Sequence, residues 1–483
     1  MERLENRHNS DTQTAIFEEA SDTLSIADML KRTLERTITS GEDMTRSLGR
    51  TARNQKLPPA TLIKFLIAAE GGSLAKELHR AGIDATPAAV SQRRRQIPPA
   101  VFRKVFLDFT SSSTYGQQNH GYKGYRVLAC DGTAVNMARN PNAPSFVCNN
   151  SAPKGYNQLH LSPLFDIYDR TYFDAVIQPA PRKDEPGALV EMLKRNDFNR
   201  KTIIVLDRGY ESYNVMARLM NTSNVYFVLR VKHNRSAMRE IARLPMLELD
   251  CDIAFTISTT QTKEDKHNHH IYLPQPKKSK TGSTTRRARW DFPSPYTMRL
   301  RVVRFQLDNG NFETLATSLP RTFTIDDLKE IYHRRWGIET SFRDLKYSAG
   351  LINLHGKRDD FVEQEIYATL TAFNFTSRIV QEVVVRQPTD GLHAYAVNFK
   401  MAVTLCKEFL NASDMTGKKS CRKSAATPSQ FGRGGRTGAT FAPRVLAGSH
   451  TVLRPEKSQP EKTGGGGLLL PAPIPVFFEK ARF

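Results

Sequence analysis

Apolar positions recur along this chain with two periods, one typical of strands and one typical of helices. Between residues 127 and 231, continuous or alternating apolar runs predict strands, and runs with a period near 3.6 residues predict helices between them. In chain order these are strands at 127–130, 158–168 and 172–178, a helix at 189–195, a strand at 203–206, a helix at 213–221 and a strand at 225–231. This succession predicts an α/β fold with helices covering a sheet.

The N-terminal region, residues 1–110, is predicted to be helical and to bind DNA. An amphipathic helix is expected around 26–36, and shorter helices at 61–69, 73–80 and 86–96 are separated by glycines. The last of these carries Arg93, Arg94 and Arg95. A helix-turn-helix that places this helix in a DNA groove is one interpretation. A generic helical bundle with a solvated basic end is the other, and the sequence leaves both open.

A polar motif marks a helix in the second half of the chain. In IYHRRWGIETSFRDLK, the residues Tyr332, Arg335, Glu339 and Lys346 are spaced by three, four and seven positions. At about 100° per residue they fall within an arc of about 60° on a regular helix. Thr324 followed by Asp327 resembles a capping box and marks the start of the helix. A carboxylate set among cations suits a metal and a phosphate, but Glu339 could equally pair with Arg335 or Arg343 on a solvated surface.

Two aspartates follow predicted strands. Asp131 comes directly after the strand at 127–130, and Asp207 comes directly after the strand at 203–206. A carboxylate at the end of a buried strand is held on rigid backbone at the edge of a sheet, where it can serve a functional site. The alternative is that each aspartate only caps a turn or a helix.

Together, Asp131 in DGT, Asp207 in DRGY and the series Tyr332, Arg335, Glu339, Lys346 resemble the DDE transposases of the bacterial insertion-sequence-4 family. The resemblance covers roughly residues 100 to 380. It implies a ribonuclease-H-like mixed sheet with flanking helices. Residues 111–235 would form the first part of this core, and residues 321–410 the second part, with the glutamate helix and possible dimerisation helices. Residues 236–320 would form a β-rich insertion between them.

The same resemblance implies roles for individual residues. Asp131, Asp207 and Glu339 would be catalytic and would hold two Mg²⁺ ions, which Mn²⁺ could replace, because all-oxygen ligands favour these metals. Phosphates of the cut DNA end would contact Tyr332, Arg335 and Lys346. The residues expected to join them in DNA binding are Arg208, Trp336, Arg343 and Trp290. For Arg208 the alternative is a solvated charge, and for Trp290 it is packing within its own small sheet.

Composition agrees with a nucleic-acid partner. The chain has 70 Lys and Arg against 49 Asp and Glu, a formal charge of +21 and a pI near 9.8. Its five cysteines are far apart and odd in number, which predicts reduced thiols. With no visible signal peptide or membrane-spanning run, we expect a bacterial cytoplasmic protein associated with the nucleoid. The expected partners are the double-stranded ends of the element, target DNA and a second copy of the chain.

Residues 411–483 differ from the rest. They hold ten of the 28 glycines, and twelve Lys or Arg against four acids, which predicts a disordered basic tail. This tail departs from the family pattern. It is either a DNA-binding extension or the degraded or frame-shifted end of a mobile element.

The sequence therefore predicts a transposase that cuts the ends of its own insertion sequence and joins the freed 3′-hydroxyls to target DNA. Two other functions stay open. One is a ribonuclease-H-like nuclease that hydrolyses DNA without joining it. The other is a transposase-derived protein that binds DNA without catalysis.

Overall fold

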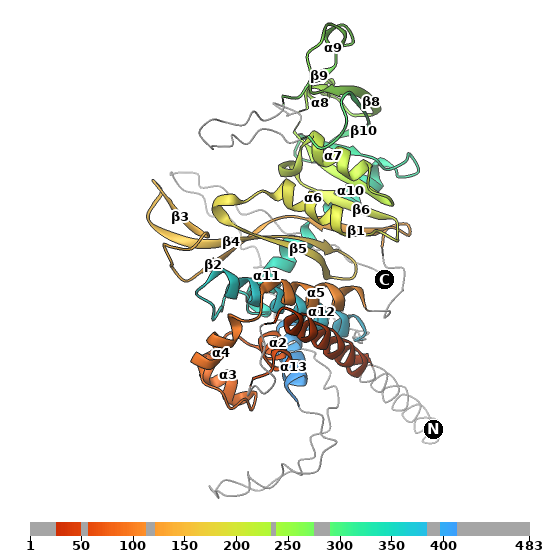
Figure 1. Cartoon of the computed structure of the whole chain (residues 1–483). Coiled ribbons are helices and arrows are strands. Elements are labelled where there is room, and N and C mark those ends of the chain that lie inside the picture. Colours follow the sequence, from red (N-terminus) through yellow and green to blue (C-terminus); the bar gives the residue numbers. More distant parts are fainter. Residues whose placement is uncertain are drawn as a thin grey trace, which may run out of the picture. The chain divides into compact units, whose positions relative to one another are not determined.

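A computed structural model describes residues 26–49, 57–112, 121–232, 238–274, 290–383 and 397–412, all within one compact unit (Figure 1). Within these ranges, no helix is long and apolar enough to cross a membrane. The predicted tail at 411–483 lies outside the described residues except for residues 411 and 412.

The core is a sheet whose central strand is β1 (Arg126–Cys130). On one side β1 pairs antiparallel with β4 (Ala152–Asp166), and β4 pairs antiparallel with β5 (Thr171–Pro179). On the other side β1 pairs parallel with β6 (Thr202–Leu206), and β6 pairs parallel with β7 (Val225–Val231). The order β5-β4-β1-β6-β7, with β4 alone antiparallel to its neighbours, is that of a ribonuclease-H-like fold. The predicted fold class is confirmed.

Helices join these strands as the sequence predicts. The 3₁₀ turn η1 (Ala180–Arg182) and α6 (Glu185–Arg195) connect β5 to β6, and the turn η2 (Arg208–Tyr210) and α7 (Tyr213–Met220) connect β6 to β7. Successive residues of β1 point to opposite faces of the sheet. Leu128 and Cys130 therefore pack with α6 and α7, while Ala129 packs with the helices of the other face.

The strands of the expected insertion do not form a separate sheet. β11 (Phe312–Thr317) pairs antiparallel with β7 and is followed outward by β10 (Tyr296–Gln306), β8 (Leu249–Ser258) and the short β9 (Ile271–Tyr272). The short helices α8 (Arg239–Ala242) and α9 (Lys263–His267) lie in the same stretch. These strands extend the core sheet because β7 would otherwise expose an unpaired edge.

The N-terminal helices pack against late helices of the chain. A helix at 26–47, α2 (Pro59–Ala68) and α5 (Pro99–Ser111) share one hydrophobic core with α12 (Asp359–Gln381) and α13 (Phe399–Asn411). Figure 1 shows α5, α11 and α12 together on the side of the sheet away from α6 and α7. The first and last parts of the described chain thus cover the same face of the sheet.

The predicted three short helices are present as α2, α3 (Leu74–Arg80) and α4 (Pro87–Arg94), and Thr86 caps α4. Two of the three arginines are nevertheless buried. Arg94 is 2% exposed and donates hydrogen bonds to Gln364, Glu365 and the carbonyl of Phe361. Arg93 is 7% exposed and donates to the carbonyl of Leu57. Arg93 and Arg94 are therefore not available to face a DNA groove, because both anchor α4 to neighbouring elements, whereas Arg95 is exposed.

Candidate active site

Asp131 and Asp207 leave neighbouring parallel strands at the same end. In the β1–β6 ladder Cys130 lies opposite Leu206, so the next residue of each strand is an aspartate. Asp131 Oδ1 accepts a hydrogen bond from the Gly132 amide at 2.7 Å, and Asp207 Oδ1 accepts one from the Gly209 amide at 2.8 Å. The capping role that the sequence left open is thus real for Asp207, which caps η2, but it leaves the other carboxylate oxygen free for a ligand.

The pairing with β4 is interrupted at Asp131 and Gly132. β2 (Thr133–Met137) continues along the same edge of β4 as β1, with Cys130 opposite Leu164 and Thr133 opposite Leu161. The two residues between them, Asp131 and Gly132, make no ladder pairs with β4. Pro163 lies opposite this gap and has no N–H to donate, which accounts for the interruption.

Gly132 is packed tightly behind the aspartate. A Cβ at this position would overlap the side chains of His160 on β4 and Glu185 at the start of α6. His160 Nε2 lies 2.8 Å from Glu185 Oε1, and His160 is 5% exposed. The loop that carries Asp131 therefore packs against a pair formed by a buried histidine and a partly buried glutamate, and only glycine fits there.

Glu339 reaches the same place from α11 (Trp336–Arg343). Arg335 joins the two acids, since its Nη2 lies 2.9 Å from Glu339 Oε1 and its Nη1 lies 3.4 Å from Asp131 Oδ2. Burial opposes the charge on this guanidinium, but Tyr332, Glu339 and Asp131 together raise the pKa of Arg335. Arg335 is therefore a permanent cation held between two carboxylates.

Burial and the neighbouring charges change the pKa of Asp131. Burial raises the pKa of Asp131 to about 6, and the negative charges of Asp207 and Glu339 add to this effect. The Gly132 amide and Arg335 act in the opposite direction but do not cancel it. The structure thus brings the three predicted acids, which are up to 208 positions apart in the chain, into one electrostatic cluster.

Three carboxylates in a partly dry site form the oxygen donor set that Mg²⁺ or Mn²⁺ prefers. As the side chains stand, however, no group of three acid, histidine or cysteine side chains within the described ranges is arranged to hold a metal ion. Arg335 contacts two of the three acids. The donor chemistry fits a divalent cation, but binding one would require these side chains to rearrange.

The helix that carries the polar motif is irregular. α10 (Ile325–His333) begins at a capping box of Thr324 and Asp327, as predicted. Between α10 and α11, backbone bonds from Arg335 to Tyr332 and from Ile338 to Arg335 span only three residues, which tightens the turn. After α11, η3 (Asp344–Ser348) has wider π-helical turns and contains Lys346. The prediction of one regular helix with a common 60° arc is therefore wrong at both ends of α11.

The residues expected to bind DNA differ in exposure. Tyr332 and Arg335 are each 7% exposed, whereas Trp336 is 56% exposed and the Arg335 guanidinium lies 5.3 Å from its ring centroid. Arg343 is also exposed. Lys346 is half-buried, and burial lowers the pKa of its ammonium group. Among these five residues, Trp336 and Arg343 are thus the ones that solvent and a large ligand reach most easily.

Trp290 lies elsewhere. It is 7% exposed, packs against Phe292 and Tyr296, and donates from Nε1 to the carbonyl of Pro293 at 3.4 Å. The expectation that this ring stacks on DNA is wrong for this structure. The packing alternative holds, because Trp290 belongs to the core beneath α7 and the outer strands.

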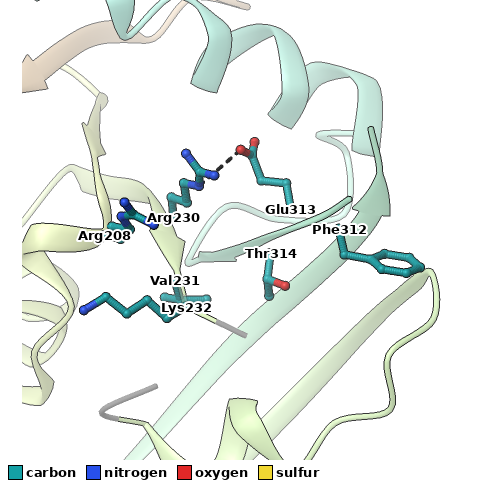
Figure 2. A pocket seen from close by; sticks show the side chains of 7 residues that line it. All are labelled: Arg208, Arg230, Val231, Lys232, Phe312, Glu313 and Thr314. Atoms are coloured by element: carbon teal, nitrogen blue, oxygen red, sulfur yellow. Dashed lines mark ion pairs between the residues drawn. The ribbon is translucent and has the colours of Figure 1, made fainter. Parts of the chain in front are cut away.

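A basic cavity adjoins the acidic cluster. It has a volume of about 250 Å³ and is lined by Arg208, Arg230, Val231, Lys232, Phe312, Glu313 and Thr314 (Figure 2). Arg208 follows Asp207 directly, and Arg230 acts on the pKa of Tyr332. The sequence indicated only Arg208. Arg230 and Lys232 are two positions apart at the end of the apolar β7 run, so they lie on the same face of the strand. This spacing of two cations could have indicated the basic cavity from the sequence.

The match to a known family covers this same region. The transposase DDE domain model matches residues 122–375, more than half of the chain, from just before β1 to within α12. The chain belongs to the transposase DDE domain family.

Comparisons of the whole transposase chain add little at the level of sequence. No curated protein matches it. Among solved structures, the cryo-EM structure of the piggyBac transposase synaptic complex with hairpin DNA covers 80% of this chain and 70% of that chain, with a TM-score of 0.40 and 11% sequence identity. In the present chain, Asp131, Asp207 and Glu339 all lie within residues 122–375, which the family model matches.

Proposed function

We propose that this transposase cuts DNA at the ends of its own insertion sequence and joins the freed 3′-hydroxyls to target DNA. The observation that supports the proposal is that Asp131 and Asp207 follow neighbouring parallel strands at the same end, while Arg335 contacts both Asp131 and Glu339. We assign the chain to the insertion-sequence-4 group of the family because the Tyr332, Arg335, Glu339 and Lys346 series accompanies these acids.

In this proposal Asp131, Asp207 and Glu339 hold two Mg²⁺ ions. When bound, the ions would activate a water or a DNA 3′-hydroxyl and stabilise the leaving oxygen of an in-line phosphoryl displacement. The tight Asp131–Gly132 loop and the cap on η2 keep two of the ligands fixed before metal arrives. Preorganised ligands lower the cost of assembling the site.

The cations beside the acids would hold the DNA backbone. Arg208, Arg230 and Lys232 line the adjoining cavity, and Arg343 and Trp336 are exposed on α11. Arg335, Tyr332 and Lys346 lie deeper and would engage the phosphate nearest the reacting bond. We further propose a homodimer that brings two ends together, in the cytoplasm of a bacterium.

Cleavage and joining of a labelled duplex tests the proposal. The duplex carries the inverted-repeat ends that flank the coding sequence, and wild type is compared with Glu339→Gln in Mg²⁺ and in EDTA. Glu191→Gln is the matched control, since Glu191 pairs with Arg195 on the exposed side of α6. Metal-dependent joined product is expected for wild type and for the control but not for Glu339→Gln.

Two other outcomes assign the alternative functions. Binding of the ends without any cleavage by wild type would indicate a DNA-binding protein that has lost catalysis. Metal-dependent cleavage that never yields a joined product would indicate a nuclease on the same core. The binding itself should weaken steeply with salt, because phosphate contacts release counterions.

A further inference from the structure

The basic cavity contains its own anion. Arg230 Nε lies 3.2 Å from Glu313 Oε2, and both residues line the cavity (Figure 2). In the β7–β11 ladder Leu315 lies opposite Arg230, which places Glu313, two residues earlier on β11, diagonally across from Arg230 on the same face. Two paired strands thus fix the backbones of both residues, and the ion pair follows from the sheet register.

Glu313 is the better buried partner. Its side chain is 10% exposed, against 39% for Arg230. Burial raises the pKa of Glu313, and the charges of Arg230 and Arg335 act in the opposite direction. The carboxylate therefore depends on these two arginines, one from the cavity and one from the acidic cluster.

The other cations of the cavity have no such partner. In the part of the chain that the structure describes, neither the Arg208 nor the Lys232 side chain lies within 4.0 Å of a carboxylate. Both residues are exposed. Figure 2 shows Arg230 between Arg208 and Glu313, so Arg230 alone among the three cations is neutralised from within.

We propose that Glu313 is an internal counter-ion that a DNA phosphate must displace from Arg230, and that this exchange makes the transposase more selective for its DNA. The inference rests on the proposed function, because it takes the DNA backbone as the ligand. A carboxylate and a phosphate cannot share one guanidinium without repelling each other. DNA that makes few other contacts with the protein does not displace Glu313 from Arg230. DNA that makes many other contacts does, and it is therefore bound preferentially.

The test is the affinity of the full chain for a random-sequence duplex, measured by fluorescence anisotropy in EDTA over a range of salt concentrations. Glu313→Gln should bind about 3- to 10-fold more tightly than wild type, with a log–log salt slope steeper by about 0.9, the value for one added phosphate contact. Glu191→Gln, which removes the same charge from an exposed ion pair, controls for net charge. Equal effects of the two substitutions, or weaker binding by Glu313→Gln, would overturn the proposal.

Substitution of Arg230 gives a second, independent test. Arg230→Gln should weaken binding, and adding Glu313→Gln to it should give no further gain, since the competition needs Arg230. A gain of the same size without Arg230 would overturn the mechanism. If Glu313→Gln melts early, Glu313→Ser, which also removes the charge, must show the same tighter binding. The binding assays contain no metal and do not measure cleavage. Failure to cut DNA in the separate Mg²⁺ assay would therefore contradict the proposed function but would leave the role of Glu313 to be decided by the binding data.

Discussion

Arg335 Nη1 lies 3.4 Å from Asp131 Oδ2, although 204 positions separate the two residues in the chain. The same guanidinium lies 2.9 Å from Glu339 Oε1. One cation thus links the end of the first core strand to the helix that carries the third acid. It compensates repulsion between carboxylates that would otherwise oppose their meeting.

Arg335→Gln should destabilise the metal-free protein by about 1–3 kcal/mol at pH 8, because it leaves two partly buried carboxylates without their shared donor. The loss should shrink at pH 5, where protonation relieves the repulsion. Added Mg²⁺ should raise the melting temperature of Arg335→Gln more than that of wild type, since the cation replaces the missing charge. Thermal unfolding monitored by circular dichroism measures both effects, and identical Mg²⁺ responses would contradict the role given to Arg335.

Asp131 should make stability depend on pH. Its folded pKa of about 6 lies above the usual value near 3.8, so folding favours the neutral acid. The stabilisation is present below about pH 4 and is lost as the pH rises through 6. Asp131→Asn should therefore stabilise the metal-free protein by about 1–3 kcal/mol at pH 7.5 and have little effect at pH 4. Urea titrations at the two pH values decide this, and destabilisation at pH 7.5 would contradict it.

Arg94 should act on stability and not on DNA. Its guanidinium is 2.6 Å from Glu365 Oε1, and both side chains are nearly inaccessible. Arg94→Ala removes the arginine from a buried carboxylate whose other oxygen keeps the hydrogen bond from the His355 amide, and it should cost about 3–5 kcal/mol. Arg95→Ala, at an exposed position next to it, should change stability by less than about 0.5 kcal/mol. Chemical unfolding compares the two, and an equal or larger loss of stability in Arg95→Ala would contradict the anchoring role given to Arg94.

The chain's two tryptophans should separate stability from DNA binding. Trp290→Ala opens a cavity among Phe292, Tyr296 and their neighbours and should cost about 3–5 kcal/mol. Trp336→Ala removes a ring that is 56% exposed, so stability should hold while affinity for DNA falls. Melting curves and DNA titrations on both variants test this, and a Trp336 variant that binds DNA like wild type would remove that residue from the interface.

Local sequence determined much of the core. The continuous apolar runs before Asp131 and Asp207 predicted β1 and β6, because strands buried on both faces need apolar residues at successive positions. Thr324 and Asp327 predicted the start of α10, since a capping box needs only residues three positions apart. The three acids came from the same kind of information, combined with a family resemblance in order and spacing.

What tertiary structure decided depends on contacts between distant segments. Arg94 is buried because α12, some 270 positions later, supplies its partners, and no local pattern reveals them. The strands of the expected insertion extend the core sheet because β7 offers them an edge. The Arg230–Glu313 pair follows from the β7–β11 register. The sequence by itself determined most of the core strands and helices and the positions of the two aspartates after β1 and β6, whereas only the tertiary structure decided which charges meet, because that depends on contacts between distant segments.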